Sequence, residues 1–489
     1  MTDQTWQIAI SFFAILAVFL AIGLASGRIA TGEREDYYLA GRNVHPWLAG
    51  LSAVATNNSG YMFIGVIGYT YNEGVAAFWL MCGWILGDFL GSSFIHRRLR
   101  QATGITKEAS FASVMARWHG EDFNVWRRLA AVVMVVFLAA YASAQISAGG
   151  KALDGVLGID PVIGATSVAV MVIIYSIVGG LRASIWTDGA QSIAMLVAMT
   201  LLFVVGVAGL GGISGTLEAW RGVPNFLDPY PRDMVVTGLA GVGLFVLGWL
   251  FAGFCVVGQP HVMVRFMSLN EDSQMTRART WYYGYFIIFY LLATGVGMLA
   301  RIYLPDLQEI DPELALPRMA VELLPGLLVG LILAGIFAAT MSTADSLVLS
   351  CSAAITHDLT PRRLESPIYL KTATALTTLV ALAFALTESR SIFSLVILAW
   401  STLGSAFGPM LALYALNRRL SEPAAIFLMA LGVGVALAWR FLLGLHGEIN
   451  EALPGIAIPL VVGWILSTPT GSVERTAAPR EDPATVPGE

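Results

Sequence analysis

A polar patch lies in the middle of an apolar segment, residues 334–359 (AGIFAATMSTADSLVLSCSAAITHDL). At its centre stand Ser342, Asp345 and Ser346, at the i, i+3 and i+4 spacing that places three oxygen-bearing side chains on one helical face. A carboxylate at membrane depth costs free energy and is a functional-site candidate by default, and ligation by oxygen alone suits hard cations. The segment therefore predicts one wall of a cation site.

An overlapping face of the same segment carries Thr343 and the small residue Ala339, which would let a neighbouring backbone approach. No Lys or Arg lies within the segment, so the sequence offers Asp345 no cation there. A simpler interpretation stays open for Ser342 and Thr343, because hydroxyls in membrane helices often bond back to the carbonyl four residues earlier.

The composition of the chain predicts that this segment crosses a membrane. The 489 residues are 56% hydrophobic and 12% charged, whereas soluble domains carry about 25% charged residues. Cys82, Cys255 and Cys351 all fall in apolar segments, which argues against a disulfide framework or a cysteine-based metal site. The chain is predicted to be a multi-pass membrane protein.

Runs of about 20 apolar residues indicate membrane-spanning helices. About thirteen are expected, and the predicted fold class is therefore an all-α polytopic membrane protein. The N-terminus lacks the basic region of a cleaved signal, so the first run is expected to remain as a helix. The expected spans are 7–27, 47–71, 75–95, 128–150, 161–181, 187–211, 234–257, 281–303, 325–356, 370–387, 391–416, 423–443 and 452–468.

The distribution of Lys and Arg predicts the orientation. If the first helix runs from outside to inside, 21 of the 28 basic residues fall in cytoplasmic segments. The N-terminus is therefore expected outside and the C-terminus in the cytoplasm, with the chain in the cell (inner) membrane.

Two of the expected spans look interrupted. The second contains ATNNSG (55–60), and the seventh is rich in glycine and ends in Gly258-Gln259-Pro260. Broken helices at matching positions, five spans apart, indicate an inverted-repeat transporter with a binding site at the membrane midplane. The alternative is that these glycines only allow close helix packing.

Five fragments in order resemble the sodium/solute symporter family, and the likeness covers roughly residues 35–420. Within this family, the fragments most resemble the branch of sodium/proline symporters. The resemblance implies a five-plus-five inverted repeat (LeuT-like) core with additional helices at both ends. The fragments are EDYYLAGR (35–42), ATNNSG (55–60), GGLRASIWTDGAQ (179–191), GQPHVMVRFM (258–267) and AATMSTADS (338–346).

The implied fold divides the chain into five parts. The expected parts are residues 1–46, with the first transmembrane helix and a cytoplasmic loop, 47–212 as the first five-helix repeat, 213–417 as the second, inverted repeat, 418–468 as two C-terminal transmembrane helices, and 469–489 as a disordered cytoplasmic tail.

The resemblance also implies a principal sodium site between the broken second span and the ninth span. Its implied ligands are the backbone carbonyls of Ala55, Asn58 and Ala339 and the hydroxyls of Ser342 and Thr343. These hydroxyls belong to the faces that the spacing of 334–359 already singles out.

A second sodium ion is implied at the acid of the WTD motif, Asp188, together with Ser342, Asp345 and Ser346. Asp188 opens an apolar segment that has no internal basic residue. Two alternatives remain open, because an acid at a helix N-terminus is stabilised by free amides and by the helix dipole, and because Arg182 is near in sequence.

Two other ionisable residues are expected to have structural roles. Asp88, near the inner end of the third span, is expected to pair with Arg97 or Arg98. His261 is expected in the cytoplasmic loop that follows the Gln-Pro turn.

The resemblance suggests where a substrate binds. The proline carriers place a carboxylate where this chain has Asn57, and aromatic residues where it has Ala252 and Val256, whereas Tyr141 matches a tyrosine of their pocket. A roomier and less aromatic pocket for a small polar or zwitterionic solute is therefore expected. The expected substrate-binding residues are Asn57, Ser59, Gly60, Tyr141, Ala252 and Val256.

The predicted function is sodium-coupled symport of a small organic solute into the cell by alternating access. An amino acid such as proline, or a related zwitterion, is the first expectation. A monocarboxylate, a vitamin or a sugar, coupled to sodium or to protons, is the alternative, and a transporter-like membrane sensor is a distant one. Neither HExxH nor GxSxG occurs, and no enzymatic activity, organic cofactor or nucleic-acid partner is expected. The expected partners are sodium, the solute and the lipid bilayer.

Overall fold

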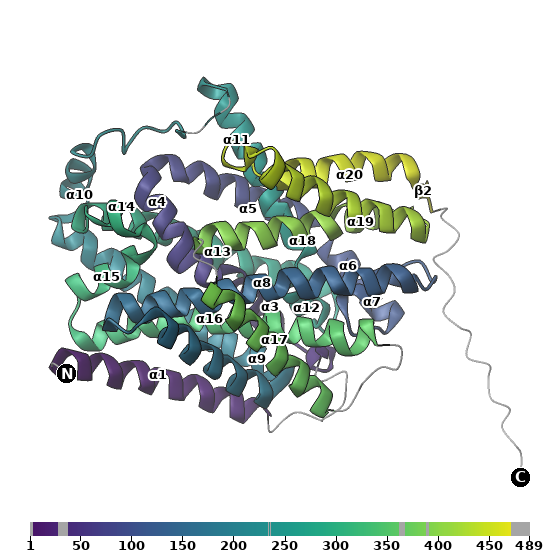
Figure 1. Ribbon diagram of the computed structural model, residues 1–489, viewed down its shortest axis with the longest axis horizontal. Coiled ribbons are helices and arrows are strands. Elements are labelled where there is room, and N and C mark those ends of the chain that lie inside the picture. The colour runs from purple at the N-terminus through teal and green to yellow at the C-terminus, as the bar shows by residue number, and fades with distance from the viewer. Residues whose placement is uncertain are drawn as a thin grey trace, which may run out of the picture.

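The computed structural model describes residues 3–27, 38–232, 234, 236–360, 367–387 and 391–470. Most of the polar tail expected at 469–489, and the first residues of the EDYYLAGR fragment, lie outside the described residues. Figure 1 shows the long helices side by side with their axes roughly aligned. This arrangement is expected of a bundle that crosses a membrane.

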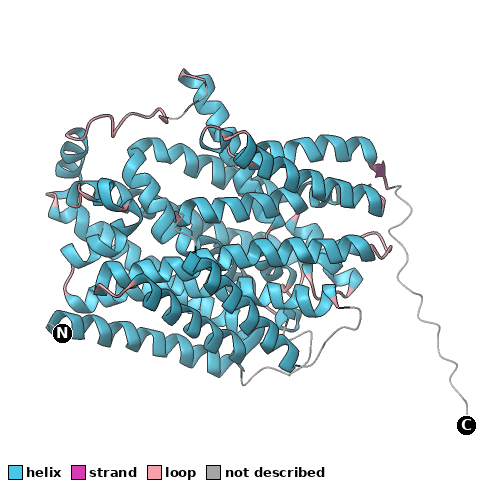
Figure 2. Cartoon of the chain, viewed as in Figure 1, coloured by secondary structure: helices cyan, strands magenta, loops and turns pink. Residues whose placement is uncertain are grey.

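The described chain is almost entirely helical, and its one sheet is a pair of two-residue strands near the C-terminus (Figure 2). The strands are β1 (Arg418–Arg419) and β2 (Thr468–Pro469), paired antiparallel. The α-helices are α1 (Asp3–Gly27), α3 (Pro46–Gly60), α4 (Ile67–Glu73), α5 (Ala77–Phe94), α6 (His96–Thr106), α7 (Phe111–Ala116), α8 (Asn124–Leu157), α9 (Pro161–Gly209), α10 (Gly212–Arg221), α11 (Gly238–Phe254), α12 (Pro260–Met267), α13 (Met275–Tyr303), α14 (Leu307–Ile310), α15 (Ala315–Leu323), α16 (Gly326–Ala353), α17 (Pro367–Thr387), α18 (Ile392–Ala415), α19 (Glu422–Leu437) and α20 (Ala452–Leu466).

Ten helical segments among the described residues are long and apolar enough to cross a membrane. One of them, Pro46–Thr106, contains two of the expected spans, and two further spans correspond to shorter apolar helices at Pro161–Ile174 and Ala452–Leu466. Each of the thirteen apolar runs is therefore helical.

The second expected span is broken, as predicted. Helix α3 reaches Ser59, whose backbone (φ 49°, ψ −177°) leaves the helical region, and a π-helix at Tyr61–Val66 follows. A Cβ on Gly60 would lie 2.7 Å from Ala148 and 2.9 Å from Thr340, so glycine lets the broken backbone approach both neighbours closely.

The seventh expected span is also interrupted, but beyond its run of glycines. Helix α11 continues through a short 3₁₀ turn at Cys255–Gly258, and Gln259 is extended before α12 begins at Pro260. The expectation of a cytoplasmic loop here is wrong, because α12 packs in the protein interior and His261 is fully buried. Proline at its first position suits a helix start, since that residue needs no backbone donor.

Glycines bring α5 and α11 into close contact. A Cβ on Gly87 of α5 would lie 1.7 Å from the carbonyl oxygen of Leu250, and one on Gly253 of α11 would lie 2.0 Å from that of Trp84. Gly83 of α5 makes a similar approach to Trp249. Small residues four apart allow helices to meet backbone to backbone in a membrane, and we refer to Gly83, Gly87 and Gly253 as the glycine seam.

Candidate functional site

The broken helix α3 and helix α16 are joined by side-chain hydrogen bonds beside the break. The Thr343 hydroxyl donates to the carbonyl oxygen of Thr56 at 2.9 Å, and the hydroxyls of Thr56 and Ser342 are 3.5 Å apart. The Ser342 hydroxyl donates to Asp188 at 2.6 Å. Both α16 hydroxyls thus bond to other helices, and the alternative that they only bond back within α16 is wrong.

The three residues expected to contribute backbone carbonyls lie in the same buried region. Ala55, Asn58 and Ala339 each have 0% of their surface exposed. Within the described part of the chain, the side-chain amide of Asn58 makes no hydrogen bond. This region therefore combines carbonyl and hydroxyl oxygens with an unsatisfied polar group, and its oxygen-only donor set fits an alkali cation.

Asp188, on α9, lies next to this region and contacts it through Ser342. Its carboxylate accepts hydrogen bonds from Ser342 and Ser52, each at 2.6 Å, and forms a salt bridge of 3.2 Å with Arg265. Both alternatives considered from the sequence are wrong, since Asp188 lies inside α9 rather than at its start and Arg182 donates to the Ala40 carbonyl instead.

Sequence reasoning missed Arg265. It lies on α12 with 0% of its surface exposed, and it donates to Ser184 at 3.1 Å as well as to Asp188 and Ser346. Its motif, GQPHVMVRFM, was placed in a loop, where an arginine needs no partner. The signal was present, because a lone arginine amid Val, Met and Phe indicates a buried, paired cation.

Ser346 and Asp345, adjacent in the sequence, contact different residues in the structure. The Ser346 hydroxyl bonds back to the Ser342 carbonyl at 2.6 Å and also accepts from Arg265. Asp345 is 2% exposed and faces Ser176 and Ser184 of α9. The residues expected to bind a second sodium ion are therefore gathered around Arg265, an arginine that does not belong to segment 334–359.

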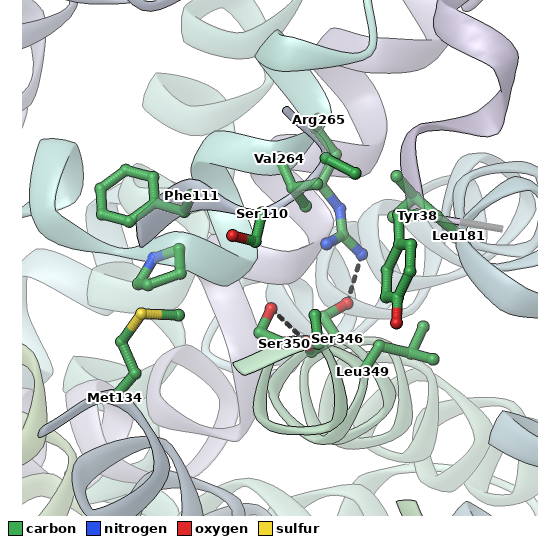
Figure 3. Close-up of a pocket in the computed structure, with 13 residues that line it drawn as sticks. Tyr38, Ser110, Phe111, Met134, Leu181, Val264, Arg265, Ser346, Leu349 and Ser350 are labelled. Carbon is green, nitrogen blue, oxygen red and sulfur yellow. Dashed lines mark hydrogen bonds between the residues drawn. The ribbon is translucent and has the colours of Figure 1, made fainter. Parts of the chain in front are cut away.

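A cavity of about 40 Å³ lies next to these residues and is lined by Arg265 and Ser346. Figure 3 shows the Arg265 side chain pointing across the cavity at Ser346, with Tyr38 and Leu349 at one side and Phe111 and Met134 at the other. A volume of this size accommodates water or an ion rather than an organic solute.

The expected substrate residues divide into two groups. Tyr141 donates to the Ser59 hydroxyl at 3.1 Å, and the Gly60 amide donates to Gln145 at 2.8 Å. The Asn57 amide instead donates to the Tyr282 hydroxyl, on the side of α3 that faces α13. The structure brings Tyr141, Ser59 and Gly60 together, whereas Asn57 bonds elsewhere.

The rings of Trp400, Tyr141 and His261 form an aromatic wall next to Ala252. The Trp400 indole of α18 donates to the Ala252 carbonyl at 2.7 Å, and its ring centroid is 6.4 Å from that of Tyr141. His261 completes this wall, with its ring 5.4 Å from Tyr141, while Val256 is fully buried nearby on the 3₁₀ turn after α11. Trp400 comes from α18 and not from the α11 positions on which the expectation of a roomier and less aromatic pocket is based, so that expectation stays a prediction.

Asp88 of α5 is not paired with Arg97 or Arg98, contrary to the prediction. It is fully buried and accepts hydrogen bonds from the hydroxyls of Tyr282 and Tyr283, each at 2.7 Å. The two arginines bond instead to groups nearer the surface, Asp272 and Asn417, at 2.9 and 2.6 Å.

At the other end of the bundle, Glu313 ties α8 to α18. Lys151 of α8 donates to Glu313 at 2.6 Å, and Glu313 accepts from the Ser391 hydroxyl at 2.6 Å and from the Phe393 amide at 3.0 Å. The Phe393 ring stacks on Tyr69 with centroids 5.0 Å apart. These contacts join α8 to the start of α18 at the end of the bundle away from the cavity.

Comparison with known proteins identifies relatives over nearly the whole chain. A family model described as the sodium:solute symporter family matches residues 37–432. Sodium/proline symporters of Staphylococcus aureus strains JH9 and COL are each 28% identical over 486 residues, covering 95% of this chain and 93% of the relative.

Solved structures of transporters have a similar fold. A Na⁺-coupled sialic acid symporter in a substrate-bound, outward-open state aligns with a TM-score of 0.77, at 21% identity over 96% of this chain and 100% of the other. Mhp1, a nucleobase-cation-symport-1 family transporter, aligns at 0.59 with 13% identity over 87% and 92%, and MhsT in complex with L-phenylalanine at 0.55 with 16% over 86% and 97%. The predicted fold class, with its five-plus-five inverted repeat (LeuT-like) core, is confirmed.

Proposed function

Because the chain belongs to the sodium:solute symporter family, a family of sodium-coupled carriers of small solutes, we propose that it imports a small zwitterionic solute together with sodium. The observation that carries this proposal is the hydrogen bond from Thr343 of α16 to Thr56 of α3, next to the break at Ser59. A cation bound here links the two helices and favours one arrangement of the break.

The proposed principal sodium site uses the carbonyl oxygens of Ala55, Asn58 and Ala339 and the hydroxyls of Ser342 and Thr343. Support comes from their full burial and from hydroxyls that bond between helices rather than within α16. The negative charge of Asp188, one hydrogen bond from Ser342, adds to the attraction for a cation.

A second sodium ion at Asp188, Asp345 and Ser346 would compete with Arg265, which bonds to Asp188 and Ser346. Occupancy of this second site therefore requires the arginine to withdraw. We assign the second site to a state of the transport cycle in which α12 has moved away from α16.

The solute is proposed to bind beside the break, between Ser59 and Gly60 of α3, Tyr141 of α8 and the Trp400 ring of α18. A zwitterion such as proline fits these groups, because hydroxyls and an amide can orient a carboxylate and aromatic faces attract an ammonium group. The relatives named sodium/proline symporters support this class of solute. A monocarboxylate, vitamin or sugar is the alternative.

The proposed mechanism is alternating access in the cell membrane, with the N-terminus outside. The broken helix α3 and helix α16, which belong to the proposed repeats at 47–212 and 213–417, move relative to each other. The cavity at Arg265 and Ser346 would then open toward the cytoplasm, at the end of the bundle opposite Glu313. Each positive charge that moves inward across about 100 mV contributes about 2.3 kcal/mol to accumulation.

Uptake assays in proteoliposomes test this function. Radiolabelled proline, other amino acids, monocarboxylates, sugars and vitamins would each be offered with an inward gradient of sodium, and again with choline or potassium in its place. We expect accumulation of one zwitterion that disappears without sodium. Accumulation that is undiminished in choline would contradict sodium coupling.

A further inference from the structure

Asp88 is a second buried acid beside the broken helix, and the proposed sodium chemistry does not use it. It lies on α5 with 0% of its surface exposed. No described residue forms a salt bridge with it, and its hydrogen-bond donors are neutral groups, Tyr282, Tyr283 and Asn57. A carboxylate buried without a cation partner costs less free energy as the neutral acid, so this position favours reversible protonation.

Two hydroxyls lead from Asp88 toward the surface, where Arg279 contacts the outer one. Arg279 donates to the Ser92 hydroxyl at 3.0 Å, the hydroxyls of Ser92 and Tyr283 are 2.6 Å apart, and Tyr283 donates to Asp88 at 2.7 Å. Arg279 is only partly buried, and it also bonds to the exposed Ser93 at 2.8 Å. The Ser92 and Tyr283 hydroxyls, linked in this way, can pass a proton by exchanging O–H partners, whereas the Arg279 guanidinium only donates and carries no proton onward.

A second arm joins the same carboxylate to the break in α3. Tyr282 donates to the other oxygen of Asp88 at 2.7 Å and accepts from the Asn57 amide. Asn57 lies two residues before Ser59, where α3 leaves the helical conformation. The ionisation state of Asp88 is therefore connected to the break through only two side chains.

We propose that Asp88 is a proton-binding site of the transport cycle. Protons reach it through Ser92 and Tyr283, and the change in its charge is transmitted to the broken helix through Tyr282 and Asn57. A hydronium ion gives a proton to the Ser92 hydroxyl, Ser92 passes its own proton to Tyr283, and Tyr283 passes its own to Asp88. One O–H bond breaks at each donor and one forms at each acceptor, so both hydroxyls end neutral and Asp88 loses its negative charge. The Tyr282 hydroxyl then loses its charged acceptor and can turn to the side-chain oxygen of Asn57, whose amide rotates to receive it.

The direction of coupling to sodium follows from charge. The ionised carboxylate adds negative potential near the proposed principal sodium site, so protonation weakens sodium binding and sodium binding releases the proton by the same factor. This part of the proposal depends on the sodium site proposed above.

The other ionisable groups around Asp88 leave this sign unchanged. Helices α3 and α11 carry none, and α13 presents the positive charge of Arg279 and two tyrosines whose neutral hydroxyls donate to the acid. Elements packed against α5 carry further ionisable groups, which are Cys255 on the 3₁₀ turn after α11, His96, Arg97, Arg98 and Arg100 on α6, Tyr69, Tyr71 and Glu73 on α4, and Arg277, Tyr285, Tyr290, Arg301 and Tyr303 elsewhere on α13.

Infrared difference spectroscopy on the purified full-length chain, titrated from about pH 9 to about pH 5 without sodium, tests the proton site directly. We expect a carboxylic-acid carbonyl band that appears on acidification in the wild type and is missing in Asp88→Asn. Asp272→Asn, a carboxylate-to-amide change at an exposed ion pair, is the matched control and should keep the band. If Asp88→Asn shows the same carboxylic-acid band as the wild type on acidification, the proposal is overturned.

Sodium titration of the same proteins, followed by tryptophan fluorescence, tests the coupling. We expect sodium affinity to weaken at least about fivefold at acidic pH in the wild type and in Asp272→Asn, and by less than about twofold in Asp88→Asn. Equal pH dependence in Asp88→Asn and wild type would overturn the coupling. Absence of sodium binding at every pH would contradict the proposed function, while the infrared band still decides the proton site.

Tyr283→Phe covers the case in which Asp88→Asn does not fold. It keeps the acid but removes one donor to the ionised form, so the midpoint of the infrared titration should move to higher pH by about one unit. A midpoint equal to that of the wild type would contradict the relay through Tyr283.

Discussion

Two buried acids flank the broken helix α3, and their surroundings differ. Asp188 on α9 has a cation, Arg265, at 3.2 Å and two serine donors. Asp88 on α5 is held by tyrosine hydroxyls and an amide, all of them neutral. The first arrangement keeps an acid ionised and ready to exchange one cation for another, and the second favours an acid that gains and loses a proton.

Removing the arginine should produce the largest difference between the two acids. Arg265→Met leaves Asp188 buried without a cation and should destabilise the protein by about 3–5 kcal/mol. The double variant Arg265→Met with Asp188→Asn removes both charges and should recover most of that loss. Thermal unfolding in detergent measures both, and a double variant no more stable than the single one would contradict a direct charge pair.

Removing one tyrosine hydroxyl at Asp88 should cost less. Tyr282→Phe takes away a hydrogen bond to an acid that keeps its donors Tyr283 and Asn57, and we expect a loss of about 1.5–3 kcal/mol in the same unfolding assay at neutral pH. The loss should shrink at acidic pH, because the protonated acid binds its donors less strongly. A loss as large as that of Arg265→Met would contradict the contrast between the two acids.

The hydroxyls of α16 should affect sodium binding more than stability. Ser342→Ala and Thr343→Ala each remove one proposed ligand, and we expect sodium affinity to fall about tenfold or more, equivalent to about 1.4 kcal/mol. Ser350→Ala is a control on the same helix, because among the described residues the Ser350 hydroxyl bonds only back to the Ser346 carbonyl. If both variants kept wild-type sodium affinity, the principal site would be misassigned.

The smallest effect is expected at the surface. Asp272→Asn breaks the exposed pair with Arg97 and should change the free energy of unfolding by less than about 1 kcal/mol. A larger loss would indicate that α6 is held in place by this pair rather than by its buried face.

The sequence alone could predict the helices, the break at Ser59 and the polar face of α16, because each depends on a local pattern. Apolar length identifies spans, a glycine after polar residues indicates a break, and helical spacing places Ser342 beside Ser346. The partners of the acids depend on which helices become neighbours. Asp88 lies close in sequence to Arg97 and Arg98, but α13 supplies its tyrosines from almost 200 positions further along the chain.

Arg265 and Trp400 illustrate the same limit. The partners of each lie on another helix, so neither contact can be predicted from the pattern of its own element. The Gln-Pro pair suggested a turn followed by a loop, whereas tertiary packing buries the turn and the arginine with it.

The glycine seam between α5 and α11 has a consequence for movement during transport. These helices lie in the two different proposed repeats, yet a carbonyl oxygen of each helix occupies the space that a Cβ on a glycine of the other helix would need. Such an interface offers no space for sliding, so α5 and α11 should travel as a single rigid body and carry Asp88 with them. A permanent covalent bridge engineered across the seam should leave turnover intact, which makes the pair a fixed frame against which the motion of α16 can be measured.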